Sequence, residues 1–105
     1  MSGLFDDKKK AAENVFALDE EKRFKVQTHA ARLFGHWVAA QFGLRDADAD
    51  HYAESVVDAD FEEPGIQDVI RKVMADFTAR GIAVTAHHLE NQFNLHLQEA
   101  LKATE

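Results

Sequence analysis

The sequence predicts an all-α protein, an antiparallel four-helix bundle over residues 21–105 that follows a mobile N-terminal arm over residues 1–20. Two observations predict the helices. Residues that break helices are scarce, since the 105 residues include one proline and five glycines. Apolar residues recur every three or four positions, and no stretch alternates as a strand does. With 46% hydrophobic residues, the chain is long enough for one domain with a small core.

The N-terminal segment has an amphipathic pattern of its own, ended by the charged run 18–23 (LDEEKR). Its apolar residues share one side of a helix: Leu4, Phe5, Ala11, Ala12, Val15 and Phe16. Asp6 and Asp7 suit the start of that helix. Burying its large side chains would contribute ~8 kcal/mol, whereas ordering about fifteen backbones costs on the order of 15 kcal/mol. We therefore expect the arm to become helical only against a partner. The alternatives are packing back onto its own bundle or an ordinary ragged terminus.

Residues 24–42 predict the helix around which the bundle is built. One apolar row contains Val26, Ala30, Leu33 and Trp37, and a second contains Phe34, Val38 and Phe42. The two rows form an arc wide enough to touch two neighbouring helices. Gly35 lies inside this helix, where glycine costs about 1 kcal/mol relative to alanine. We expect it to allow close approach of another helix.

Two more helices are predicted on either side of Pro64. The first begins within residues 45–50, after Gly43, and ends near Phe61; its apolar positions are Ala49, Tyr52, Ala53, Val56 and Val57. The second has apolar positions Ile66, Val69, Ile70, Val73, Met74 and Phe77. Within it, Asp68 and Lys72 are spaced to pair across one turn.

The last helix is predicted to follow a short connection between Gly81 and Thr85. Gly81 is suited to ending the preceding helix, and Thr85 is suited to capping the next one. The inner face of this last helix is formed by Leu89, Phe93, Leu97, Ala100 and Leu101. Because the connections are short, successive helices are expected to be antiparallel neighbours.

The composition of the chain indicates which kinds of partner it could bind and in which compartment it is expected. The net charge of −7 argues against binding nucleic acid, whose phosphates would be repelled. No apolar run approaches the ~18 residues of a membrane span, and the N-terminus has no signal-peptide core. Cysteine is absent, which fits a reducing compartment. These features predict a cytoplasmic protein without direct membrane insertion.

The sequence contains only incomplete matches to catalytic and metal-binding patterns. Asp46, Asp48 and Asp50 imitate the start of a calcium-binding EF-hand loop, but His51 replaces the required glycine and Val57 the required glutamate. The six histidines form no His-x3-His pair, and His96 is expected to be half-buried and hydrogen-bonded. The acidic residues Asp58, Asp60, Glu62 and Glu63 have no nucleophile near them in sequence and resemble a solvated helix end. The sequence therefore predicts no enzyme, no metal and no cofactor.

Several segments, in order along nearly the whole chain, resemble a known family. They include Phe5-Asp6-Asp7, FALDEE (16–21), Gly35 with Trp37, VVDADFEEPG (56–65) and DVIRKV (68–73). The most specific piece is ADFEE-x-G-x-x-DV-x-RKV. On these segments the chain resembles the zeta subunit of the alphaproteobacterial F-type ATP synthase, a small ATPase inhibitor.

The resemblance implies an inhibitory N-terminal region that is mobile when free. Such a region becomes helical between the α and β subunits of the catalytic head, near the central stalk, and blocks rotation in the direction of hydrolysis. Carried over by position, the wedge would span about residues 4–18. The implied partner-binding residues are Leu4, Phe5, Asp6, Asp7, Lys8, Lys9, Lys10, Val15, Phe16 and Leu18. The protein would be monomeric when free and would associate peripherally with the membrane-bound ATP synthase.

An alternative function is a regulatory module that binds a purine nucleotide, ATP or ADP, in a groove between helices. Arg71, Lys72 and His51 could face a phosphate in such a groove. A titration with ATP would discriminate this function from inhibition by the arm.

Overall fold

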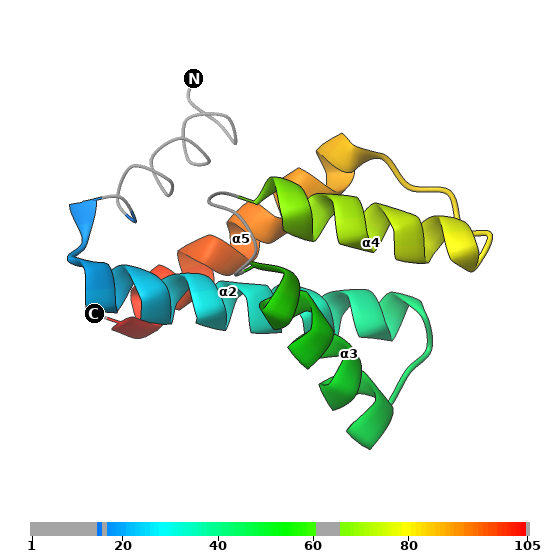
Figure 1. Cartoon of the computed structure of the whole chain (residues 1–105), viewed down its shortest axis with the longest axis horizontal. Helices are drawn as coiled ribbons and strands as arrows, with labels where there is room; N and C mark the ends of the chain where they lie inside the picture. Colours follow the sequence, from blue (N-terminus) through cyan, green and yellow to red (C-terminus); the bar gives the residue numbers. More distant parts are fainter. Residues whose placement is uncertain (1–14, 16, 61–65, 105) are drawn as a thin grey trace.

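The computed structural model describes residue 15, residues 17–60 and residues 66–104, with side chains at positions 60 and 104 left aside. This part of the chain contains four helices: α2 (Glu20–Gln41), α3 (Asp46–Asp60), α4 (Gln67–Ala79) and α5 (Ala86–Thr104). Successive helices reverse direction, and α3 crosses α2 obliquely (Figure 1). The predicted four-helix bundle is confirmed.

Helix α2 is the central element of the bundle. It packs most extensively against α3 and α5, while α4 lies against α3 and α5. The predicted arc that touches two neighbours is therefore confirmed. Phe34, on this arc, is fully buried and meets Phe93 of α5 edge to face, with ring centroids 5.5 Å apart. Phe42 makes an edge contact with Phe77 of α4 at 4.8 Å.

The core draws on one face of each helix. Buried residues from all four helices form a single cluster, and Val15 from the N-terminal segment belongs to it. The cluster comprises Val15, Val26, Ala30, Ala31, Phe34, Val38, Val56, Val57, Val69, Ile70, Val73, Phe77, Leu89, Phe93, Leu97 and Ala100. Leu33 and Trp37 are only half-buried, whereas Phe24 is 55% exposed.

The ends of the helices follow local signals. Gly43 and Gly81 adopt positive φ values of 76° and 71° after α2 and α4, as expected of glycine at a helix end. The Thr85 hydroxyl accepts a hydrogen bond from the His88 amide at 3.1 Å, which confirms the predicted cap of α5. The predicted end of α3 near Phe61, and Pro64 after it, lie outside the described residues.

Helix α2 begins earlier than residues 24–42 predicted. Asp19 is its N-cap, and the Asp19 Oδ1 atom accepts a hydrogen bond from the Lys22 amide at 2.9 Å. Glu20 and Glu21 then occupy the first turn, where the helix dipole favours negative charge. Most of the charged run 18–23 is therefore helical. Within this run, only Leu18 and Asp19 lie outside a helix.

Candidate functional site

Two members of the predicted partner-binding set lie within the described structure, Val15 and Leu18. Val15 is 3% exposed and belongs to the hydrophobic core, and Leu18 packs against that core. The other members lie outside the described residues: Leu4, Phe5, Asp6, Asp7, Lys8, Lys9, Lys10 and Phe16. The base of the segment predicted as an arm is thus in contact with the bundle.

Hydrogen bonds reinforce the contact at the base of the arm. The Leu18 amide donates to the Val15 carbonyl at 3.1 Å, which closes a turn. The Leu18 carbonyl in turn accepts from Arg23 Nη2 at 3.2 Å. Arg23 lies in the first turns of α2, so its side chain ties this turn to the bundle. Val15, Leu18 and Arg23 thus form a junction between the N-terminal segment and α2.

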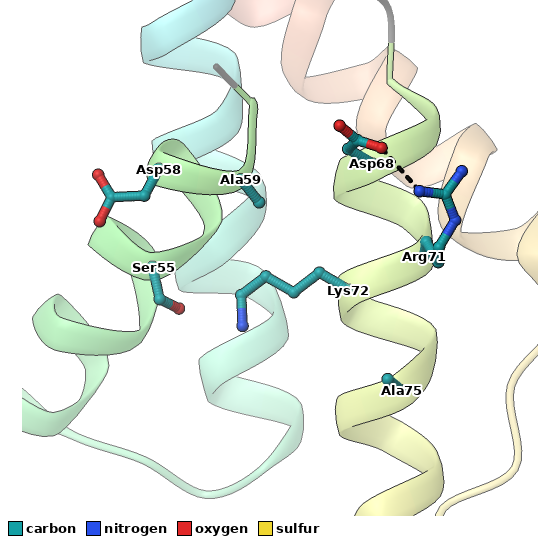
Figure 2. A pocket seen from close by; sticks show the side chains of 7 residues that line it. All are labelled: Ser55, Asp58, Ala59, Asp68, Arg71, Lys72 and Ala75. Atoms are coloured by element: carbon teal, nitrogen blue, oxygen red, sulfur yellow. Dashed lines mark hydrogen bonds and ion pairs between the residues drawn. The ribbon is translucent and has the colours of Figure 1, made fainter. Parts of the chain in front are cut away.

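A second candidate site is an open cavity of about 470 Å³ between α3 and α4. Figure 2 shows its walls, with α3 on one side and α4 on the other. It is lined by Ser55, Asp58, Ala59, Asp68, Arg71, Lys72 and Ala75. Of the residues predicted to bind a nucleotide, the structure brings Arg71 and Lys72 to this cavity, whereas His51 is exposed on α3 and is not part of the lining.

Both lysine and arginine in the cavity wall are engaged in ion pairs. Arg71 Nη1 lies 2.7 Å from Asp68 Oδ1, and Lys72 Nζ lies 2.9 Å from Asp76 Oδ2. The predicted pairing of Asp68 with Lys72 is therefore wrong. Asp76 is equally one turn from Lys72, and its carboxylate is already held by the Tyr52 hydroxyl of α3 at 2.7 Å. That bond makes Asp76 a preorganised acceptor for the ammonium group.

The uncharged Tyr52 hydroxyl links α3 to α4 by donating a hydrogen bond to Asp76. Burial raises the pKa of the Tyr52 hydroxyl far above its ordinary value of 10.0, and the hydrogen bond to Asp76 raises this pKa further. The Lys72 ammonium lies 5.1 Å from the centre of the Tyr52 ring, within range of a cation–π contact. The three side chains form one polar link between the two helices, so their evident role is structural.

The remaining sequence candidates are dispersed. His96 has a 13% exposed side chain and lies 2.7 Å from Glu99 Oε1 and 3.2 Å from Gln92 Nε2, as expected of a half-buried, hydrogen-bonded residue. Asp46, Asp48 and Asp50 are exposed at the start of α3. Within the described ranges, no group of three or more His, Cys, Asp or Glu side chains could hold a metal ion.

Sequence reasoning missed the role of Asp68 in the cavity. Its side chain is 7% exposed, and its Oδ2 atom is buried without a hydrogen-bond partner among the described residues. Asp68 and Asp76 each lie one helical turn from Lys72, so the sequence offers both as partners. Nothing in the sequence indicates that Tyr52 holds Asp76 in place. The burial of Val15 agrees with the alternative that the N-terminal segment packs back onto its own bundle. Helical periodicity could not choose between the alternatives, because it does not say which surface an apolar face will cover.

Comparison with known proteins adds one finding. A family model described as ATPase inhibitor subunit zeta matches residues 1–103. The matched range includes the N-terminal segment as well as α2, α3, α4 and most of α5. No curated protein matches the chain. Within the described helices, none has an apolar stretch long enough to cross a membrane.

Proposed function

Because the chain belongs to the ATPase inhibitor subunit zeta family, we propose that it binds an F-type ATPase and inhibits ATP hydrolysis through its N-terminal arm. The arm enters a catalytic interface of the head between the α and β subunits, becomes helical there and blocks rotation. The observation that carries this proposal is the family match over residues 1–103, which includes the entire predicted arm. The protein associates in this way with the periphery of the membrane-bound synthase.

The composition of the core supports a division of roles along the chain. Among the described residues, every member of the buried cluster except Val15 comes from α2, α3, α4 or α5. The bundle therefore buries most of its apolar surface without help from the arm. Apolar side chains of the arm such as Phe5 gain burial when a partner supplies the opposing surface.

The junction formed by Val15, Leu18 and Arg23 limits how the arm can reach a partner. Val15 is buried in the bundle, so it cannot contact the ATPase unless the base of the arm detaches, and Leu18 is partly buried against the same core. Residues 1–14, as a helix, would extend about 21 Å beyond that point. The leading part of the wedge is accordingly assigned to residues 4–14.

A pair of matched phenylalanine substitutions tests this function. Hydrolysis by the cognate F-type ATPase is measured against increasing concentrations of intact chain, of Phe5→Ala and of Phe24→Ala. Losing a phenylalanine buried at the interface should weaken inhibition about tenfold or more. Phe24 is 55% exposed on α2, outside the proposed wedge, so its replacement should leave the inhibition curve unchanged. Failure of the intact chain to slow hydrolysis, or equal loss in both variants, would overturn the proposal.

A further inference from the structure

The backbone changes direction just before α2, and two side chains hold the bend (Figure 1). In a continuous helix, the Lys22 amide would donate to the Leu18 carbonyl. In this chain the Lys22 amide donates to Asp19 Oδ1 at 2.9 Å. The Leu18 carbonyl accepts from Arg23 Nη2 at 3.2 Å. Asp19 and Arg23 therefore satisfy, from either side, the two backbone groups that the bend separates.

The conformation of Asp19 agrees with a defined bend. Its backbone is extended, with φ of −67° and ψ of 168°, as is typical of the residue that caps a helix. The helical bonding of α2 then begins between the Arg23 amide and the Asp19 carbonyl at 2.9 Å. The Leu18 side chain is partly buried against the core, where a carbonyl without a donor would destabilise the fold. Arg23, itself half-buried, supplies that donor.

The bend brings Val15 to the core. Val15 is 3% exposed and belongs to the same buried cluster as Val26, the first residue of α2 in that cluster. In one continuous helix these two residues would lie about 16.5 Å apart along the axis. The Leu18 amide instead donates to the Val15 carbonyl at 3.1 Å, which closes a turn. The burial of Val15 and the bend at Leu18 and Asp19 thus belong to one conformation.

We propose that Asp19 and Arg23 are positioning residues for inhibition, because they hold this bend and so determine the direction in which the arm leaves the bundle. This role rests on the inhibitory function proposed above, since the direction of the arm matters only if the arm binds. Both residues lie outside the wedge of residues 4–18 and act on it through the junction. An arm whose direction is already restricted loses less freedom on binding, so the bend strengthens inhibition.

The bend can be measured in the full chain without an ATPase. The chain contains no cysteine, so Ala17→Cys and His87→Cys provide two specific sites for spin labels. Both positions are exposed, one before the bend and the other in the first turn of α5. Double electron–electron resonance should give one narrow distribution of distances between the labels. Adding Arg23→Met, which keeps the aliphatic part of the side chain, or Asp19→Ala should broaden that distribution.

The effect on inhibition is measured with the same substitutions in the unlabelled chain. The half-inhibitory concentration is determined for hydrolysis by the cognate F-type ATPase. Asp19→Ala and Arg23→Met should each raise this concentration about three- to tenfold, because the arm then loses more freedom on binding. Asp19→Asn keeps an acceptor for the Lys22 amide, so it should inhibit almost as well as the intact chain.

Two control variants separate positioning from stability and from charge. Thr85→Ala removes the cap that accepts from the His88 amide at the start of α5, a loss comparable to that of the Asp19 cap. Lys25→Met removes a neighbouring positive charge of α2, whose pair with Glu21 at 3.4 Å is exposed. Neither control should broaden the label distances or change the half-inhibitory concentration.

The outcomes distinguish this role from the inhibitory function itself. The positioning role is overturned if Asp19→Ala and Arg23→Met both keep the narrow distance distribution, or if Thr85→Ala weakens inhibition as much as Asp19→Ala. It is also overturned if Arg23→Met alone weakens inhibition, because Arg23 would then contact the ATPase directly. An intact chain that never slows hydrolysis would overturn the proposed function and the positioning role together. The label distances would still show whether the two side chains hold the bend.

Discussion

Gly35 permits a close approach between α2 and α3. A Cβ atom at this position would lie 2.7 Å from Ala53 Cα and 3.2 Å from the Ala53 carbonyl oxygen of α3. The expectation that an interior glycine of α2 serves close helix packing is therefore confirmed. Because the nearest atom belongs to backbone, no side-chain rotation can make room for a larger residue.

Gly35→Ala should destabilise the protein despite the better helix propensity of alanine. The substitution gains about 1 kcal/mol in propensity, whereas overpacking against backbone costs ~1–3 kcal/mol. Chemical denaturation of the variant should show a net loss. Adding Ala53→Gly should not restore stability, since the closest contact is with Cα and remains. Complete rescue by the second substitution would contradict this close backbone approach of α3 to α2.

Tyr52 gives stability a specific dependence on alkaline pH. Its pKa is raised in the folded state by burial and by the hydrogen bond to Asp76, so the folded protein keeps a proton that the unfolded chain releases above about pH 10. Its contribution is therefore full below about pH 10 and is lost progressively as the pH rises from there toward the folded-state pKa. The free energy of unfolding, measured by chemical denaturation at several pH values from about 8 to 11, should decrease more steeply with pH for the native protein than for Tyr52→Phe. Parallel pH profiles would show that this hydroxyl is not the cause.

The start of α2 depends on a single cap. Helical periodicity located the apolar face of this helix, but it could not say that Asp19, within a charged run, would begin the helix four residues earlier. The side chain of Asp19 satisfies the Lys22 amide, one of the donors left free at any helix start. Glycines after α2 and α4 were predictable stops because each must adopt positive φ.

Asp19→Ala should cost about 1 kcal/mol of stability, because it removes the acceptor from the Lys22 amide. Asp19→Asn retains an acceptor oxygen and should lose only a few tenths of that amount. Glu20→Ala, at an exposed first-turn position, serves as the control. Thermal melting checks all three. Equal effects of Asp19→Ala and Glu20→Ala would mean that charge near the helix start, rather than the cap, determines stability.

At the scale of the whole molecule, sequence reasoning predicted the number, order and inner faces of the helices. These follow from periodicity and from breakers, which are local properties. The sequence indicated a groove between helices with Arg71 and Lys72 beside it, but not that this cavity would lie between α3 and α4, because that depends on how far apart two helices lie. The partner of Lys72 was missed for a related reason: Tyr52, from another helix, selects Asp76 over Asp68. Contacts between elements require the assembled bundle.

The burial of Val15 determines how truncation of the N-terminal segment should affect stability. If residues 1–18 were a separate arm, their removal would leave the melting of the bundle almost unchanged. Val15 is 3% exposed within the core, however, so a chain lacking residues 1–18 should lose ~1–2 kcal/mol. A chain lacking only residues 1–14 keeps Val15, the turn to Leu18 and the Asp19 cap, and it should retain the stability of the intact chain.

The most direct test of the account is to measure stability and inhibition together on the chain that lacks residues 1–14. We predict a melting curve that coincides with that of the intact protein and a complete loss of inhibition of ATP hydrolysis by the F-type ATPase. A truncated chain that melts normally and still inhibits as strongly as the intact protein would contradict the account, because the bundle itself would then be the inhibitory element.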